Sequence, residues 1–142
     1  MSEKVLLVDD EKDFLEIMAQ RMEARGFEIT TAQSAEQALS MIDKKPFDAI
    51  VMDFQMPGMD GMEALKAIKA KSPELQIILL TGYATVEKTV EAIKAGASDF
   101  LEKPADIEVL AEKIKKATAD KKLHIEKQTE ERVNDILQRF GG

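Results

Sequence analysis

The strongest constraint on the fold is the alternation of short apolar runs with segments of helical periodicity. The short runs have the length and composition of buried strands, and the segments between them carry apolar residues three and four positions apart. The expected strands are residues 5–8, 27–31, 49–52, 77–80 and 99–101. The expected helices are residues 10–25, a segment that begins at Ser34, residues 62–70, residues 85–95 and a segment capped by Asp106. Such alternation predicts a parallel sheet with helices on both faces.

Five strand–helix units in about 120 residues suit one domain of the α/β class. Right-handed crossovers limit the possible topologies, and a doubly wound, flavodoxin-like (βα)5 sheet with strand order 2-1-3-4-5 is the natural choice. Hydrophobic residues make up 44% of the chain, which supports a folded core. We therefore expect a domain over residues 1–119 and a helical extension, linker or tail over residues 120–142.

The extension is highly charged and has no proline or glycine before its last two residues. The apolar spacing of the preceding helix is lost at Lys121 and resumes out of register at Val133, which argues against a continuous coiled coil. We expect a short amphipathic helix from about residue 126 to Phe140, packed on its own domain, on a second copy or on a partner. A continuous last helix of about 35 residues and a frayed tail are the alternatives.

Composition and charge exclude several classes of protein. The chain has no cysteine, which rules out disulfides and thiolate chemistry, and its net charge of −7 argues against direct, non-specific binding of nucleic acid. No apolar run is long enough for a signal peptide or a membrane span. We therefore expect a cytoplasmic protein that does not insert into membranes.

Polar residues follow four of the expected strands. Asp9 and Asp10 come after the first, Asp53 after the third, Thr81 after the fourth and Lys103 after the fifth. Parallel strands bring these ends to one edge of the sheet, and ligands of such sheets bind where strands 1 and 3 diverge. We therefore expect three acids, a hydroxyl and a lysine to meet there.

These groups suit phosphoryl transfer to a carboxylate. Clustered carboxylates require a cation or raised pKa values, and oxygen ligands favour Mg²⁺ (or Mn²⁺) over zinc. A carboxylate can also act as the nucleophile and form an aspartyl phosphate, whose oxygens then need donors. Gly58 and Gly61 suit a tight loop beside such a site. Asp10 is expected to cap the first helix as well, with Asp13 at the third helical position.

Four segments together resemble the receiver domain of two-component response regulators: "VLLVDDE", "DAIVMDFQMPGMDGME", "IILLTGYA" and "AIKAGASDFLEKP". The resemblance covers residues 3 to about 119 and is strongest to receivers of nitrogen-regulator-type transcription factors. It implies a phosphoprotein of signal transduction rather than an enzyme, with only self-catalysed phosphotransfer and autodephosphorylation. The phosphoryl donor would be a sensor histidine kinase or a phosphotransfer protein of a phosphorelay.

The resemblance also implies roles for single residues. Asp53 would be the phospho-acceptor, and Asp10, Asp53 and the backbone carbonyl of Gln55 would supply metal ligands. Asp9 would hold the waters of the metal. Thr81 would bind the phosphoryl group and Lys103 would form an ion pair with it.

Three further features follow from the same resemblance. The bond between Lys103 and Pro104 would be cis, and Tyr83 would be the switch aromatic. The surface formed by the fourth helix, the fifth strand and the fifth helix (residues 85–95, 99–101 and the segment from Asp106) would change its preference for a downstream protein or a second copy.

Other interpretations are a phosphorylation-independent interaction domain, an aspartate-nucleophile phosphatase and a nucleotide-binding domain. The phosphatase needs a second acid two residues after its nucleophile, where this chain has Gln55, which cannot act as a general acid. No glycine-rich phosphate loop follows the first strand. Whether the chain is a complete single-domain regulator or a receiver cut from a longer protein stays open.

Overall fold

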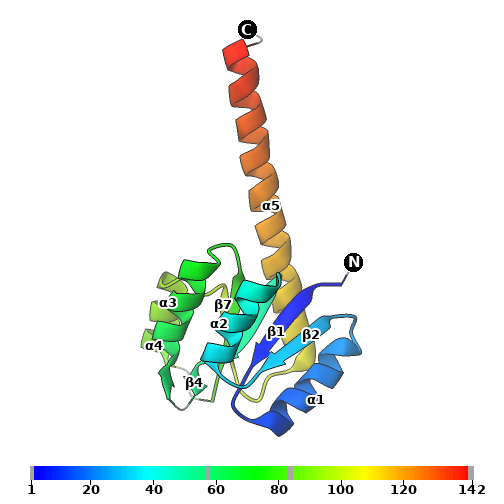
Figure 1. The fold of residues 1–142 in the computed structure, drawn as a ribbon, viewed down its shortest axis with the longest axis vertical. Coiled ribbons are helices and arrows are strands. Elements are labelled where there is room, and N and C mark those ends of the chain that lie inside the picture. The colour runs from blue at the N-terminus through cyan, green and yellow to red at the C-terminus, as the bar shows by residue number, and fades with distance from the viewer. Residues whose placement is uncertain (1, 57, 83–84, 141–142) are drawn as a thin grey trace.

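The computed structural model describes residues 2–56, 58–82 and 85–140. It shows a central parallel sheet between two layers of helices, with a long C-terminal helix that leaves the body of the domain (Figure 1). The strands of the sheet are β1 (Lys4–Val8), β2 (Glu28–Ala32), β3 (Ala49–Asp53), β6 (Gln76–Thr81) and β7 (Asp99–Glu102). The helices are α1 (Lys12–Glu23), α2 (Ala35–Lys44), α3 (Gly61–Lys71), α4 (Val86–Lys94) and α5 (Ile107–Phe140).

The strand order is β2-β1-β3-β6-β7, and every neighbouring pair is parallel. Because β4 and β5 form a separate small hairpin, β6 and β7 are the fourth and fifth strands of the sheet. The predicted α/β fold and its order 2-1-3-4-5 are therefore confirmed.

The sheet separates two apolar clusters, as the alternation of side chains along a strand requires. Leu6, Ile50 and Leu79 point to the face covered by α2 and α3. Leu7 and Val51 point to the other face, where α1 and the start of α5 pack. The three central strands are buried on both faces, which explains their continuous apolar runs.

The loop after β3 folds into a hairpin that the sequence did not predict: β4 (Gln55–Met56) pairs with β5 (Met59–Asp60). Gly58 in its turn has a positive φ of 81°. A Cβ atom on Gly61 would lie 2.1 Å from the carbonyl oxygen of Phe54, so only glycine fits there. The hairpin and the close packing of Gly61 against Phe54 fix the path of the backbone directly after Asp53.

Helix α5 begins where expected, since Asp106 Oδ1 accepts a hydrogen bond of 2.8 Å from the backbone N–H of Glu108. The expectation of a separate short helix from about residue 126 is wrong, because α5 continues without a break to Phe140 (Figure 1). No proline or glycine interrupts it, and its Lys, Glu, Ala and Gln residues favour helix. Within the described residues, no helix combines the length and apolar character needed to cross a membrane.

Candidate functional site

The three acids meet at the carboxyl end of the sheet. Asp9 and Asp10 follow β1, and Asp53 is the last residue of β3, which pairs with β1. One carboxylate oxygen from each of the three lies within 4.8 Å of the others. Asp9 is 1% exposed and Asp53 is 6% exposed, whereas Asp10 is exposed to solvent. The cluster therefore has a buried floor and an open side.

The backbone at the end of β1 explains why Asp10 faces solvent. Asp9 Oδ1 accepts a hydrogen bond of 2.9 Å from the backbone N–H of Glu11, a turn that aspartate commonly forms. Glu11, not Asp10, is the N-cap residue of α1, and its side chain makes no capping hydrogen bond. The expected capping role of Asp10 is therefore wrong, and its carboxylate is not used to start the helix.

Lys103 reaches the acids from the loop after β7. Its Nζ donates hydrogen bonds to Asp9 Oδ2 at 2.8 Å and to Asp53 Oδ2 at 3.2 Å. The same nitrogen lies 4.4 Å from the centroid of the Phe14 ring on α1. The backbone N–H of Lys103 donates to the Thr81 carbonyl at 2.7 Å, which ties the loop to β6, and the bond between Lys103 and Pro104 is cis.

The electrostatics of the site follow from burial and crowding. Burial raises the pKa of Asp53, and the charge of Asp9 adds to this, against the opposing effects of the Gln55 N–H and Lys103. Burial alone would lower the pKa of Lys103, but its hydrogen bond to Asp9 and the two carboxylate charges raise it. Lys103 forms ion pairs with two of the three clustered acids, Asp9 and Asp53. The cluster therefore carries more negative than positive charge, which favours an additional cation.

The raised pKa of Asp53 predicts an unusual pH dependence for the metal-free protein. A carboxyl group whose pKa is higher in the folded state stabilises the fold when protonated, and this contribution is lost as pH rises through the folded pKa. In chelator, lowering the pH from 7 towards the ordinary value of 3.8 should therefore increase the stability of wild type relative to Asp53→Asn. Urea unfolding of both proteins across this range measures the difference; parallel curves would contradict the prediction.

The other expected site residues lie around this cluster. Thr81 ends β6 and is buried beside β3. Gln55 is exposed, and its backbone N–H donates to Asp53 Oδ1 at 3.0 Å, which fixes the orientation of that carboxylate. Tyr83 lies outside the described residues, so its expected role as switch aromatic has no structural counterpart here.

Sequence reasoning missed two aromatic residues. Phe14 lies against Lys103, and Phe100 on β7 makes an edge-on contact with Phe54, the residue after Asp53, at a centroid distance of 5.8 Å. Both rings are half-buried and fit the apolar periodicity of their elements. The sequence pattern therefore predicts ordinary core residues at both positions. The available signals were spacings along the sequence: Phe14 lies four residues after Asp10, and Phe100 lies three residues before Lys103.

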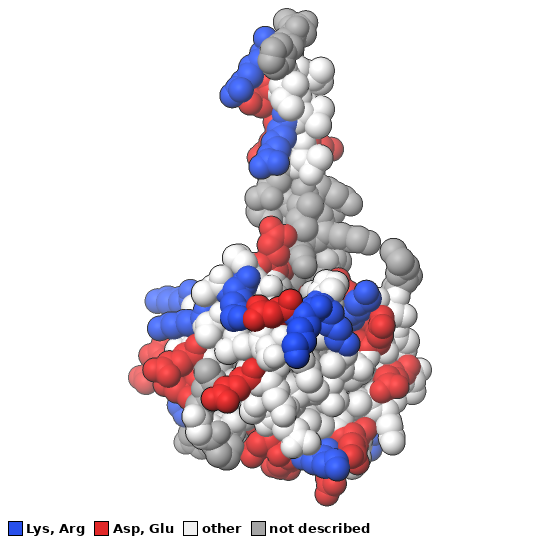
Figure 2. All heavy atoms as spheres, viewed as in Figure 1, with Lys and Arg blue, Asp and Glu red and all other residues white. Residues whose placement is uncertain are grey.

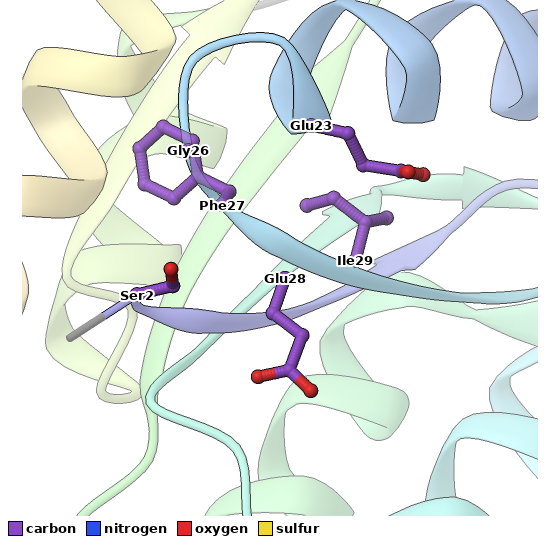
Figure 3. Close-up of a pocket in the computed structure, with 6 residues that line it drawn as sticks. All are labelled: Ser2, Glu23, Gly26, Phe27, Glu28 and Ile29. Carbon is purple, nitrogen blue, oxygen red and sulfur yellow. The ribbon is translucent and has the colours of Figure 1, made fainter.

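A hollow of about 450 Å³ lies away from the acids. It is lined by Ser2, Glu23, Gly26, Phe27, Glu28 and Ile29. Ile29 pairs with Val5, near the amino end of the sheet, whereas the acids lie at the carboxyl end. Figure 3 shows the side chains of Glu23 and Glu28 pointing in different directions, so no set of polar groups converges in this hollow.

The sequence matches the family model described as the response regulator receiver domain over residues 5–115. Among curated proteins it is 39% identical over 115 residues to the transcriptional regulatory protein ZraR of Salmonella typhimurium, covering 81% of this chain and 26% of ZraR. It is 38% identical over 121 residues to the putative response regulator NtrX-like of Rickettsia bellii, covering 84% and 25%. The chain thus spans about a quarter of the length of these relatives.

Solved structures agree in fold and sequence. The receiver of the CheY-like protein from Methanospirillum hungatei superposes with a TM-score of 0.82 at 31% identity, covering 87% of this chain and 99% of that one. The beryllofluoride-activated NtrC4 receiver domain dimer gives a TM-score of 0.78 at 36% identity, covering 83% and 98%. With the acids, the threonine and the lysine at the expected edge of the sheet, the chain belongs to the response regulator receiver domain family.

Proposed function

We propose that Asp53 accepts a phosphoryl group from a phosphohistidine. One Asp53 carboxylate oxygen attacks phosphorus, the bond between phosphorus and the histidine nitrogen breaks, and the released imidazole takes up a proton. The observation that carries this proposal is the placement of a buried Asp53 within 4.8 Å of two further acids and 3.2 Å from an ammonium group. Catalysis by such a site consists mainly of positioning and charge neutralisation.

The donor set fits Mg²⁺, or Mn²⁺ in its place. The cluster offers carboxylate oxygens only, and its open side at Asp10 leaves room for water and a phosphoryl oxygen. Asp10, Asp53 and the Gln55 carbonyl would be ligands, and Asp9 would hold metal-bound water. Bound metal would neutralise charge on the phosphoryl oxygens.

Thr81 and Lys103 would receive the transferred group. Thr81 would donate its hydroxyl to a phosphoryl oxygen, and Lys103 would exchange its contact with the Asp53 carboxylate for one with the phosphoryl group. The new charge is satisfied only when these groups close on it, so phosphorylation would shift the population towards a second conformation. The contact between Phe54 and Phe100 would carry this change from the end of β3 to β7.

The responding surface would be the one formed by α4, β7 and the start of α5, named here the output surface. These elements carry several exposed apolar side chains: Val86, Val90 and Ile93 on α4, and Val109 on α5. Exposed apolar groups on adjoining elements are typical of protein-binding surfaces. We propose a downstream protein, a second copy or an output domain as the partner, and a sensor histidine kinase or phosphotransfer protein as the donor.

We propose that signalling proceeds through protein contacts rather than direct contact with nucleic acid. On the face seen in Figure 2, the described Lys and Arg side chains of the domain are interspersed with Asp and Glu. Electrostatic binding to phosphate backbones favours a concentrated basic surface instead. The net charge of −7 points the same way.

The test of phosphorylation is intact mass after incubation with Mg²⁺ and acetyl phosphate. Wild type should gain about 80 Da, the mass of one phosphoryl group, and Asp53→Ala should gain nothing. Labelling of Asp53→Ala to the wild-type level would contradict the assignment of the acceptor. Sizing of the same samples separates two outcomes: a change of size on labelling indicates self-association, and an unchanged size indicates a separate partner.

We propose that residues 120–142 form an extension that is not needed for the chemistry of the domain. Among the described residues, the buried apolar side chains of α5 all precede the extension: Ile107, Leu110, Ala111, Ile114 and Ala117. In the extension, Val133, Ile136 and Leu137 are about half-exposed. Truncation after Ala119 should change the free energy of unfolding by less than about 1 kcal/mol and leave the labelling rate unchanged. Loss of folding or of labelling would show that the extension belongs to the domain.

A further inference from the structure

We propose that Phe14 is a positioning residue for Lys103, whose ammonium it holds beside Asp53. The Lys103 Nζ lies 4.4 Å from the centroid of the Phe14 ring and 3.2 Å from Asp53 Oδ2. A cation within about 6 Å of a ring face is attracted by the negative electrostatic potential of that face. The ammonium group is thus held by two carboxylates and one ring. The inference rests on the proposed function of Asp53.

Phe14 is well placed for this task because its own position is fixed from two sides. It lies in the first turn of α1, directly after the turn in which Asp9 accepts the N–H of Glu11. Its half-buried ring packs against the cluster that contains Leu15 and Ile107. The position of the ring is therefore fixed relative to the Asp9 carboxylate, which also contacts Lys103.

The ring matters because the other two partners of Lys103 are shared. Asp9 and Asp53 belong to the acidic cluster, so a bound cation would compete with the ammonium group for their oxygens. The Phe14 ring is neutral and does not enter this competition. The ring would therefore keep the long, flexible Lys103 side chain near Asp53 even when a bound cation occupies the carboxylate oxygens of Asp9 and Asp53.

The kinetic test compares Phe14→Leu, which keeps an apolar side chain but removes the ring, with Phe14→Tyr, which keeps the ring. With Mg²⁺ and saturating acetyl phosphate, Phe14→Leu should be labelled about two- to fivefold more slowly than wild type, as the strength of a partly exposed contact of this kind implies. Phe14→Tyr should retain the wild-type rate. Ile29→Val, which alters a half-buried residue of the same apolar cluster near the other end of the sheet, is the packing control and should also retain it.

A spectroscopic measurement tests the contact itself. The ring current should shift the ε-methylene protons of Lys103 upfield in wild type and Phe14→Tyr, and the shift should vanish in Phe14→Leu; Lys103→Ala assigns the signal. An unchanged Lys103 signal or a wild-type labelling rate in Phe14→Leu would overturn the inference. If wild type is not labelled at all, the proposed function fails, and the ring-current comparison still decides whether Phe14 holds Lys103.

Discussion

Lys103→Ala is expected to destabilise the metal-free protein by about 3 kcal/mol, because it leaves buried carboxylates without their cation. Lys103 is within hydrogen-bonding distance of both Asp9 and Asp53, the two buried acids of the site. Mg²⁺ should recover much of this loss, since it supplies positive charge at the same place. The labelling rate should still fall by at least about a hundredfold, the typical cost of removing a donor to developing negative charge.

The matched control is Lys113→Ala, which removes a different ion pair of the same domain. Lys113 Nζ lies 2.7 Å from Asp99 Oδ2, but both side chains are partly exposed. Such a pair contributes at most about 1 kcal/mol, and its loss should not change labelling. Urea unfolding with and without Mg²⁺ measures the stabilities. A Lys103→Ala protein as stable as wild type in chelator would show that the acids do not depend on this cation.

Mg²⁺ is expected to stabilise wild type by about 2.7 kcal/mol when free Mg²⁺ is about a hundred times its Kd, because a ligand that binds only the folded state adds its binding free energy. Asp10→Asn should weaken this response strongly, since it removes the exposed carboxylate of the cluster. The substitution itself should cost little in chelator, because Asp10 makes no cap to α1.

Asp13→Asn serves as the control for charge alone. Asp13 is an exposed acid three residues further along, and it is not a member of the acidic cluster. Its replacement should leave the response to Mg²⁺ within about 0.5 kcal/mol of wild type. Equal responses of Asp10→Asn and wild type would exclude Asp10 as a ligand.

Much of the fold was readable from the sequence because the three central strands are buried on both faces. Their continuous apolar runs, separated by helical segments, leave few topologies open, and the observed order β2-β1-β3-β6-β7 is the predicted one. The cluster of Asp9, Asp10 and Asp53 followed from the same rule, since parallel strands bring their carboxyl ends to one edge.

Features that depend on tertiary contacts were not readable. The hairpin of β4 and β5 has only two residues in each strand, too few for a periodic signal. The N-cap residue of α1 is Glu11 rather than Asp10, because the Asp9 carboxylate accepts the Glu11 N–H in a local turn before the helix. Composition alone does not reveal that such a turn competes with capping by Asp10. The contact of Phe14 with Lys103 could not be predicted for another reason. An aromatic residue in an amphipathic helix shows the same sequence pattern whether its ring only packs in the core or also contacts a lysine.

The continuous α5 shows a limit of apolar periodicity. The change of register near Lys121 suggested an interruption, but the chain from there to Phe140 contains neither glycine nor proline, the usual signals for the end of a helix. Loss of an apolar stripe removes packing partners without ending the helix. The distal part of α5 therefore leaves the domain as a helix with exposed Val133, Ile136 and Leu137.

The most direct test of the central claim is to locate the phosphoryl group on the chain. Wild type labelled with acetyl phosphate and Mg²⁺ is treated with borohydride, which reduces an aspartyl phosphate to homoserine, and is then digested for peptide sequencing by mass spectrometry. The proposed function predicts homoserine at position 53 and at no other carboxylate. Homoserine at Asp9 or Asp10, or a labelled protein that yields none, would contradict the assignment of Asp53 as the acceptor.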